Sequence, residues 1–310
     1  RKYLLAATML LGCCMTSLMG QRPKPIVHSS HSHDHDHHEV VPEHRTCGSM
    51  EVYDLKLQQD PILRQAVSAN QRAYEQWLSS GGHQGQRNVV TIPIVVHIIY
   101  SSNANAISAA RVQSQIDVLN EDYRRLNSDT ANTPAVFQPI AADSEIEFCL
   151  ATQDPNGAPT SGINRIQNSQ ANHNMNQEGT LKSIIQWNPE KYLNVWVVET
   201  INGGQVLGYA TFPTALPSQP QLDGVVMGAQ FFGFNSPGAP YNLGRTMTHE
   251  VGHWLGLFHT FQGGCSGTNA NNCNSGGDLV CDTPPTSSPN FSCPSGSPNT
   301  CTESPNDQVD

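Results

Sequence analysis

The apolar residues after about residue 88 predict a domain in which strands and helices alternate. Residues 91–100, TIPIVVHIIY, form a nearly unbroken apolar and β-branched run, which is typical of a strand buried on both faces. Between residues 108 and 127, apolar side chains recur at spacings of four and three, as on a helix that packs against a sheet. Ser108 is a suitable cap for this helix. The apolar stripe consists of Val112, Ile116, Leu119, Tyr123 and Leu126.

Three further apolar runs, at residues 145–151, 193–200 and 223–230, predict more strands, and polar loops separate them. A buried first strand, followed by a helix and then by more strands, favours parallel pairing. The sequence therefore predicts an α/β (α+β) domain that starts at about Asn88 and contains a twisted, mixed and mostly parallel sheet.

Residues 60–79 predict a separate helix ahead of this domain. Asp60 can cap the helix, and Pro61 suits its first turn. The segment GGHQGQR at residues 81–87 then interrupts the pattern. The expected apolar face of the helix consists of Leu63, Val67, Tyr74 and Leu78.

The N-terminal residues place two basic residues before an apolar run, which is the layout of a secretory signal, here residues 1–20. No other stretch approaches the ~20 continuous apolar residues that a membrane-spanning helix requires. The motif LLGC resembles a bacterial lipobox, so Cys13 is a candidate for a lipid anchor, and a cut near Gly20 is the alternative. We therefore expect a secreted or cell-surface protein without a transmembrane segment.

A histidine-rich tract follows the expected signal. Residues 28–44 contain seven of the thirteen histidines and show no hydrophobic period, so this low-complexity tract is expected to remain unfolded. Clustered imidazoles can collect zinc without a preformed geometry. A solvated linker explains the same composition equally well, so both interpretations stay open.

The cysteines gather near the C-terminus. Of the nine cysteines, five lie in the last 46 residues among Gly, Ser, Asn and Pro, a composition too poor in apolar side chains to pack unaided. In an exported protein this pattern predicts disulfide-stapled loops. Because five is odd, at least one of them is expected to pair elsewhere: with Cys149, with Cys47, or beyond residue 310. The five are Cys265, Cys273, Cys281, Cys293 and Cys301.

The residues HEVGHWLGLFH, numbered 249–259, have a spacing that suits a metal ion. Residues four apart project from one face of a helix, so His249 and His253 can each offer an imidazole nitrogen to the same ion. Gly256 can take the positive φ that ends a helix and turns the chain, which brings His259 back as a third ligand. Glu250 is offset by about 100° from His249 and lies beside the ion without binding it.

Three neutral imidazoles leave one position of a tetrahedral zinc ion open for water, which is a catalytic arrangement. Zinc lowers the pKa of that water to about 7 and polarises a peptide carbonyl, while a carboxylate within reach removes the proton. We therefore predict that Glu250 is the general base of peptide hydrolysis and passes the proton to the departing amine. The apolar spacers, which are expected to bury the helix in a core, are Val251, Trp254, Leu255 and Leu257.

The stretch HEVGHWLGLFHTF resembles the active-site helix of the metzincin metallopeptidases, and its sequence is most similar to that of the pappalysin family. Other stretches resemble the same family, so the similarity covers about residues 90–300. These stretches are IPIVVHIIY at residues 92–100, IDVLNEDYRRLN at 116–127, FCLATQDPNGAPTSGINR at 148–165, YLNVWVV at 192–198 and GDLVCDTPP at 277–285. The resemblance implies a metzincin-like domain with a backing helix and an active-site helix, in which His249, His253 and His259 bind zinc and Glu250 is the base.

The resemblance also implies a calcium site in the loop after the zinc helix, where GDLVCDTPP offers the oxygen ligands that calcium prefers. A metzincin is further expected to carry a methionine-bearing turn after the third histidine, yet all seven methionines precede it, the last being Met247. Either the chain departs from the metzincin class or it is truncated before that turn, and the odd number of cysteines in the loop-rich C-terminal subdomain favours truncation. The candidate calcium ligands are Asp278, Asp282 and Thr283.

Cys47 stands in RTCGSMEVYD, upstream of the expected catalytic domain. A thiolate is a good zinc ligand and could take the fourth position of the ion, displacing the water. In the pappalysin family a propeptide cysteine has this role, and the Cys-Gly pair here is similar in wording and place. The alternative is a structural disulfide. We expect the segment that carries Cys47 to be removed by cleavage in the glycine-rich segment that ends at Arg87.

The sequence thus predicts a secreted zinc metalloendopeptidase that hydrolyses proteins or peptides and is made as a latent precursor. We expect a signal at residues 1–20, a His-rich linker and propeptide at 21–87, a catalytic subdomain at 88–259 and a Cys-rich subdomain at 260–310. A net charge of -10 and the lack of a basic stripe argue against a nucleic-acid partner. The alternatives are a non-catalytic metal-binding or adhesion protein on the same fold, or a metal-sequestering protein led by the His-rich tract. Glu250 favours the enzyme, because a fold kept only for binding needs no base there.

Overall fold

The computed structural model describes residues 46–80, 88–104, 106–266, 276–280, 283–290 and 299–301. Several expectations concern residues outside these ranges: the signal at 1–20 with Cys13, the His-rich tract at 28–44, and the segment that ends at Arg87. The same holds for Asp282, Cys273, Cys281 and Cys293.

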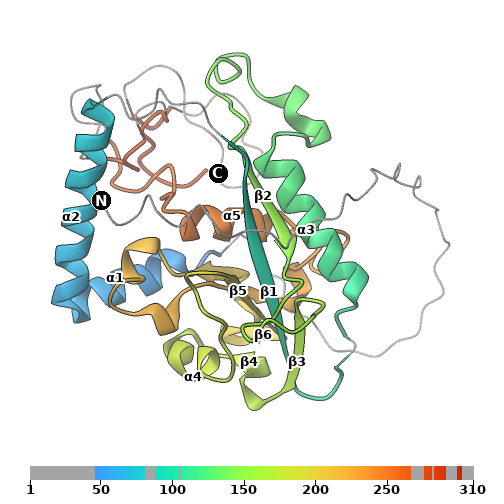
Figure 1. The fold of residues 1–310 in the computed structure, drawn as a ribbon. Helices are drawn as coiled ribbons and strands as arrows, with labels where there is room; N and C mark the ends of the chain where they lie inside the picture. The colour runs from blue at the N-terminus through green and yellow to red at the C-terminus, as the bar shows by residue number, and fades with distance from the viewer. Residues whose placement is uncertain are drawn as a thin grey trace.

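A six-stranded sheet forms the centre of the described chain, and β1 (Val90–Tyr100) is one of its inner strands (Figure 1). Along one edge, β1 pairs in parallel first with β2 (Ile146–Leu150) and then with β3 (Ile163–Gln167). Along its other edge, β1 pairs in parallel with β5 (Leu193–Val198). All residues from 94 to 99 are buried, which confirms the predicted strand with two covered faces.

The sheet ends in an edge strand on the side of β5. β8 (Val225–Gly228) pairs in parallel with β5, and β7 (Gly208–Ala210) pairs with β8 in the antiparallel direction. The mixed, mostly parallel sheet predicted from the sequence is therefore confirmed. The sequence pattern does not reveal β7, because three residues are too few to show an alternation. A small second sheet pairs β4 (Asn172–His173) with β6 (Thr200–Ile201).

Helices cover the sheet on several sides. The backing helix α3 (Ala109–Tyr123) lies beside β2 (Figure 1), and α1 (Ser49–Gln59) contacts β7. The α-helices of the described chain are α1 (Ser49–Gln59), α2 (Pro61–Ser79), α3 (Ala109–Tyr123), α4 (Glu178–Lys182) and α5 (Arg245–Trp254). Short 3₁₀ turns occupy Ser128–Asn132, Ser169–Ala171, Met175–Gln177, Asn202–Gly204, Pro213–Ala215, Pro220–Leu222 and Ala229–Phe231.

The helix α3 begins where the sequence predicts and ends earlier. The hydroxyl of Ser108 accepts a hydrogen bond from the N–H of Arg111 at 3.1 Å, which caps the first turn. Leu126 is 63% exposed, so its predicted place on the buried stripe is wrong. The helix ends at Tyr123, and Arg125 takes a positive φ of 51° that turns the chain away. The stripe that packs on the sheet is Val112, Ile116, Leu119 and, partly buried, Tyr123.

Replacement of Leu119 with alanine is expected to lower the free energy of unfolding by about 2–5 kcal/mol, because the side chain is fully buried and its loss leaves a cavity. Leu126→Ala is the matched control, and its exposed side chain predicts a change within about 0.5 kcal/mol. Urea denaturation of the two variants measures the difference. Equal stability would contradict the packing of α3.

The helix α2 also begins as predicted. Oδ1 of Asp60 accepts hydrogen bonds from the N–H groups of Ile62 at 2.8 Å and Leu63 at 3.1 Å. Leu63 is fully buried, but Tyr74 is 42% exposed, so the predicted apolar face is buried only in part. The preceding helix α1 is not evident in the sequence, because its apolar residues do not recur at the spacing of one helical face. Residues 46–80, which contain both helices, are named the prosegment because they lie within the propeptide that the sequence analysis expects at residues 21–87.

The cysteines follow the expected stapling in part. Cys265 and Cys301 form a disulfide, and Cys149 is also disulfide-bonded, whereas Cys47 is a free thiol. The alternative of a structural disulfide at Cys47 is therefore wrong.

Among the helices of the described ranges, none is both long and apolar enough to cross a membrane.

Candidate active site

The helix α5 is anchored in the main core. Its residues Met247 and Val251 are fully buried, so the helix is held against the sheet by this side. His249 and His253 lie one turn apart on another side of the helix. Of the predicted apolar spacers, Val251 lies in the core, and Trp254 and Leu255 pack against it from partly buried positions.

The turn that follows α5 returns the chain to the helix. Gly256 has a φ of 105°, as predicted, and only glycine adopts this conformation without strain. The N–H of Leu257 donates to the carbonyl oxygen of Gly252 at 2.9 Å, so the chain folds back at once. His259 is thereby brought beside the helix and is buried. Leu257 itself is 53% exposed, so its predicted burial is wrong; it points outward from this turn.

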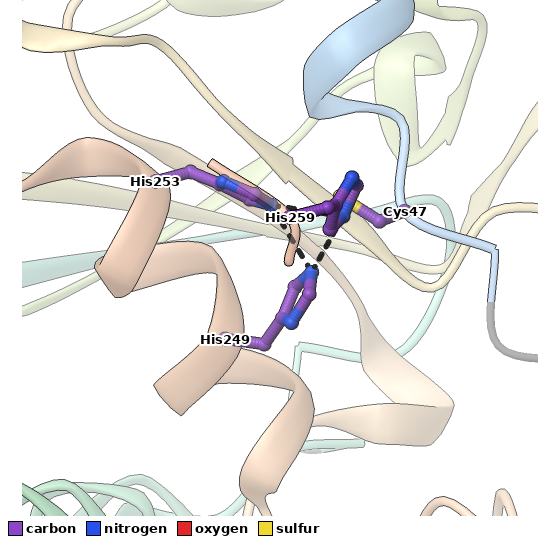
Figure 2. Close-up of side chains that lie close together, drawn as sticks. All are labelled: Cys47, His249, His253 and His259. Atoms are coloured by element: carbon purple, nitrogen blue, oxygen red, sulfur yellow. Dashed lines mark hydrogen bonds between the residues drawn. The ribbon is translucent and has the colours of Figure 1, made fainter. Parts of the chain in front are cut away.

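The three histidines converge on one point, as Figure 2 shows. Nε2 of His249 lies 3.1 Å from Nε2 of His253 and 3.1 Å from Nε2 of His259, and the latter two atoms are 3.2 Å apart. A tetrahedral ion with bonds of about 2.0–2.1 Å places its ligand atoms about 3.3 Å apart. The triangle of nitrogens therefore has nearly the size of one face of a zinc coordination shell.

The tautomer of His253 also fits a histidine that binds a metal ion through Nε2. Its Nδ1 lies 2.6 Å from the carbonyl oxygen of Leu257, and because a carbonyl only accepts, Nδ1 carries the proton. In the neutral imidazole, Nε2 then holds a lone pair that faces the other two histidines. Such a contact to the remaining ring nitrogen is what orients metal-binding histidines in proteins. The donor set thus fits a divalent metal ion.

Cys47 lies next to the histidine triangle although it is about 200 positions away in the sequence. Its Sγ and one nitrogen of each of His249, His253 and His259 all lie within 4.8 Å of one another (Figure 2). The backbone places it there: the N–H of Leu207 donates to the carbonyl oxygen of Thr46 at 3.0 Å, and the N–H of Gly48 donates to that of Gly208 at 3.0 Å. The prosegment therefore adds a short parallel bridge to the edge strand β7.

Glu250 is 1% exposed and faces the prosegment. The thiol of Cys47 donates to its Oε2 at 3.5 Å, and the hydroxyl of Ser49 donates to the same oxygen at 2.7 Å. The Ser49 hydroxyl also accepts a hydrogen bond from the N–H of Ala210, in β7, at 2.8 Å. Burial, with the negative charge of Glu250 as a second cause, raises the pKa of the Cys47 thiol well above its usual range.

The contact between Ser49 and Glu250 is not foreseen in the sequence analysis. The only signal is that Ser49 stands two residues after Cys47, and nothing in its spacing shows that it reaches Glu250. The edge strand β7 is likewise absent from the sequence expectations, although it positions both Cys47 and Ser49.

The expected calcium ligands are placed only in part. Oδ1 of Asp278 accepts a hydrogen bond from the N–H of Val280 at 3.0 Å, and the Asp278 side chain is buried. Thr283 is half-buried, and Asp282 lies outside the described residues. Within the described ranges, the cluster of His, Cys, Asp or Glu side chains close enough to share an ion consists of Cys47 and the three histidines, and Asp278 is not part of it.

Comparison with known proteins shows which sequences this chain resembles. The sequence pattern of the family described as Pregnancy-associated plasma protein-A matches residues 178–308. An extracellular metalloprotease of Pyricularia oryzae is 32% identical over 261 residues, which cover 81% of this chain and 74% of that protein. Extracellular metalloprotease 1 of Coccidioides posadasii is 35% identical over 224 residues, which cover 70% of this chain and 66% of the relative. The chain thus spans roughly two thirds to three quarters of the length of these relatives.

Solved structures show the same fold. A promirolysin mutant of Tannerella forsythia matches with a TM-score of 0.71 and 37% identity, covering 85% of this chain and 84% of that one. Mature mirolysin of the same organism, in complex with a cleaved peptide, matches with a TM-score of 0.63 and 40% identity, covering 72% of this chain and 82% of that one. The chain therefore belongs to the family of pregnancy-associated plasma protein-A, the pappalysin metallopeptidases, as the pattern around the three histidines predicts.

Proposed function

We propose that this chain is an exported zinc metalloendopeptidase in which His249, His253 and His259 hold the ion and Glu250 is the general base. The observation that carries the proposal is the triangle of three Nε2 atoms, 3.1 to 3.2 Å apart, which lies beside the helix that carries His249, Glu250 and His253. The extracellular metalloproteases among its relatives support the same activity and support export.

The residues divide the chemistry between them. The histidines would hold a zinc ion, which would supply a Lewis acid that acidifies water and polarises the carbonyl of the bond to be cleaved. Glu250 accepts the proton from the attacking water and delivers it to the nitrogen of the departing amine. The edge strand β7 binds the substrate in an extended form, because its backbone is the place where the prosegment forms its bridge.

The prosegment keeps the precursor latent through two contacts. Cys47 would supply a fourth ligand to an ion held by the histidines, because its Sγ lies beside the histidine triangle. Ser49 engages the general base at the same time, since its hydroxyl donates to Glu250 at 2.7 Å. The promirolysin structure matches 85% of this chain, whereas the mature mirolysin structure matches 72%. This difference supports a removable segment ahead of the catalytic domain.

The order of segments follows from this assignment: a signal at residues 1–20, a His-rich linker and propeptide at 21–87, a catalytic subdomain at 88–259 and a Cys-rich subdomain at 260–310. Cleavage after Arg87 releases the propeptide. N-terminal sequencing of the matured protein tests this site, and a first residue far from Asn88 would contradict it. Whether Cys13 carries a lipid is decided by mass spectrometry of the exported precursor.

A calcium ion held by Asp278, Asp282 and Thr283 remains part of the proposal. Its support is the buried carboxyl of Asp278 in the loop after the zinc helix, together with the family resemblance. Calcium raises the melting temperature of the metal-depleted protein if this assignment is right, and an Asp278→Ala variant loses that response. A melting temperature that does not change with calcium would end this part of the assignment.

Removal and return of zinc test the catalytic assignment directly. Dialysis of the matured full-length protein against a zinc chelator is expected to abolish casein hydrolysis, because the ion supplies the Lewis acid. One equivalent of zinc should restore the activity of the wild-type enzyme. The His253→Ala variant should not retain a bound zinc ion, and its casein hydrolysis should not return. Casein hydrolysis that persists after complete zinc removal would overturn the proposed function.

The alternative of a non-catalytic binding or adhesion protein is not favoured. The relatives that cover most of this chain are named metalloproteases, and Glu250 is retained beside the histidines in a buried position. A protein kept only for binding metal gains nothing from a buried carboxylate that does not coordinate the ion.

A further inference from the structure

We propose that Glu178 is a specificity-determining residue, which binds the positively charged side chain of a substrate Lys or Arg about three residues from the cleaved bond. Lys56 of the prosegment occupies that place in the precursor. The inference rests on the proposed function, and it adds a recognition site on the substrate at some distance from the metal.

One face of α1 inserts its side chains toward the catalytic domain. These residues recur at spacings of three and four, so they share a side of the helix. At one end of the face Ser49 reaches Glu250, and in its middle the ring of Tyr53 packs on Phe212 with centroids 4.6 Å apart. At its other end Lys56 reaches Glu178. The face consists of Ser49, Val52, Tyr53 and Lys56.

Glu178, in α4, uses its two carboxylate oxygens differently. Oε1 lies 2.7 Å from Nζ of Lys182, an ion pair within the same helix, and the Lys182 side chain is 0% exposed. Oε2 lies 2.9 Å from Nζ of Lys56, with both side chains largely buried. The first oxygen is therefore held within the catalytic domain, whereas the second faces the prosegment and is uncovered when the prosegment leaves.

The charges around Glu178 balance only while Lys56 is present. Burial opposes ionisation of Glu178, but the ammonium groups of Lys182 and Lys56 outweigh it and lower its pKa to about 2. Asp223 adds a second carboxyl group within the electrostatic reach of both lysines, and burial raises its pKa to about 6. Departure of Lys56 leaves two carboxyl groups against the ammonium of Lys182. The remaining negative charge attracts a cation.

The position of this cluster relative to the cleaved bond follows from β7. Gly208 is adjacent to the general base: a Cβ added to it would lie 3.0 Å from Cγ of Glu250. Thr211 follows three residues later, about 10 Å along an extended chain, and its Oγ1 lies 3.1 Å from Oε1 of Glu178 and 3.4 Å from Nζ of Lys56. A peptide bound along β7 with its cleaved bond at Glu250 therefore presents a side chain to Glu178 about three residues away.

The test compares peptides that differ in one charge. Internally quenched peptides carry Lys at the third position on the N-terminal side or on the C-terminal side of the cleaved bond. In the matched peptides norleucine keeps the methylene stem and removes the ammonium. The matured full-length enzyme is assayed beside Glu178→Gln and the exposed control Glu190→Ala, and mass spectrometry verifies the cleaved bond.

We expect kcat/KM to be about tenfold higher for Lys than for norleucine at one of the two positions, as for a partly desolvated charge pair. Glu178→Gln should lose this ratio, and Glu190→Ala should keep it. If Glu178→Gln does not fold, the wild-type ratio alone decides. Equal rates for Lys and norleucine at both positions, or a ratio that survives Glu178→Gln, would overturn the inference while leaving the peptidase assignment intact. Failure of the matured wild type to cleave any peptide would instead overturn the proposed function and this site with it.

Discussion

Replacement of Cys47 with alanine is expected to make the uncleaved precursor an active peptidase, about 100-fold more active than the wild-type precursor, which corresponds to about 2.7 kcal/mol of prosegment binding. The Sγ of Cys47 lies within 4.8 Å of a nitrogen of each of the three histidines, where in our assignment it would take the position on the ion that water needs. Alanine cannot bind the ion. The short bridge to β7 remains, so activity rises to the extent that the prosegment moves off this strand.

The measurement is hydrolysis of a quenched peptide by precursors whose N-termini are verified as uncleaved. Ser49→Ala tests the second contact: loss of one hydrogen bond to a buried carboxylate predicts a smaller gain of roughly tenfold, which corresponds to about 1.4 kcal/mol. Asp54→Ala, on the exposed side of α1, is the control and should leave latency unchanged. A Cys47→Ala precursor as inert as the wild type, with both active after maturation, would refute the role of this thiol.

Replacement of Glu250 with glutamine in the matured enzyme is expected to reduce kcat by about 10²–10⁴-fold, because the amide cannot take the proton of the attacking water. Glutamine keeps the shape of the side chain, which matters in a position that is 1% exposed. Zinc content should stay at one equivalent, since in our assignment the ligands are the three histidines and not Glu250. Loss of activity with retained zinc therefore separates a failure of the base from a failure of the metal site.

The control for this substitution is Glu190→Ala, an exposed glutamate that should leave kcat unchanged. Binding of a substrate peptide is measured in parallel, because a missing base should slow the chemistry without weakening the complex. Wild-type rates in Glu250→Gln would show that another group takes the proton and would remove Glu250 from the mechanism.

The sequence by itself determined the features that depend on neighbours along the chain. Helical spacing put His249 and His253 one turn apart, and the lack of a Cβ let Gly256 turn the chain so that His259 returns. The same kind of local reasoning found the buried strand β1, the cap of α3 at Ser108 and the cap of α2 at Asp60. It failed at Leu126 and Leu257, because hydrophobic spacing does not show where a helix stops.

Only the tertiary structure decided what meets the zinc helix from elsewhere. The short edge strand β7 has no periodic signal, yet it brings Cys47 and Ser49 of the prosegment to the histidines and to Glu250. Lys56 and Glu178 stand more than a hundred residues apart and form a largely buried ion pair. Such contacts depend on how strands and helices stack across the sheet. A sequence pattern records the side on which a residue lies, but not the distant residue that packs against it.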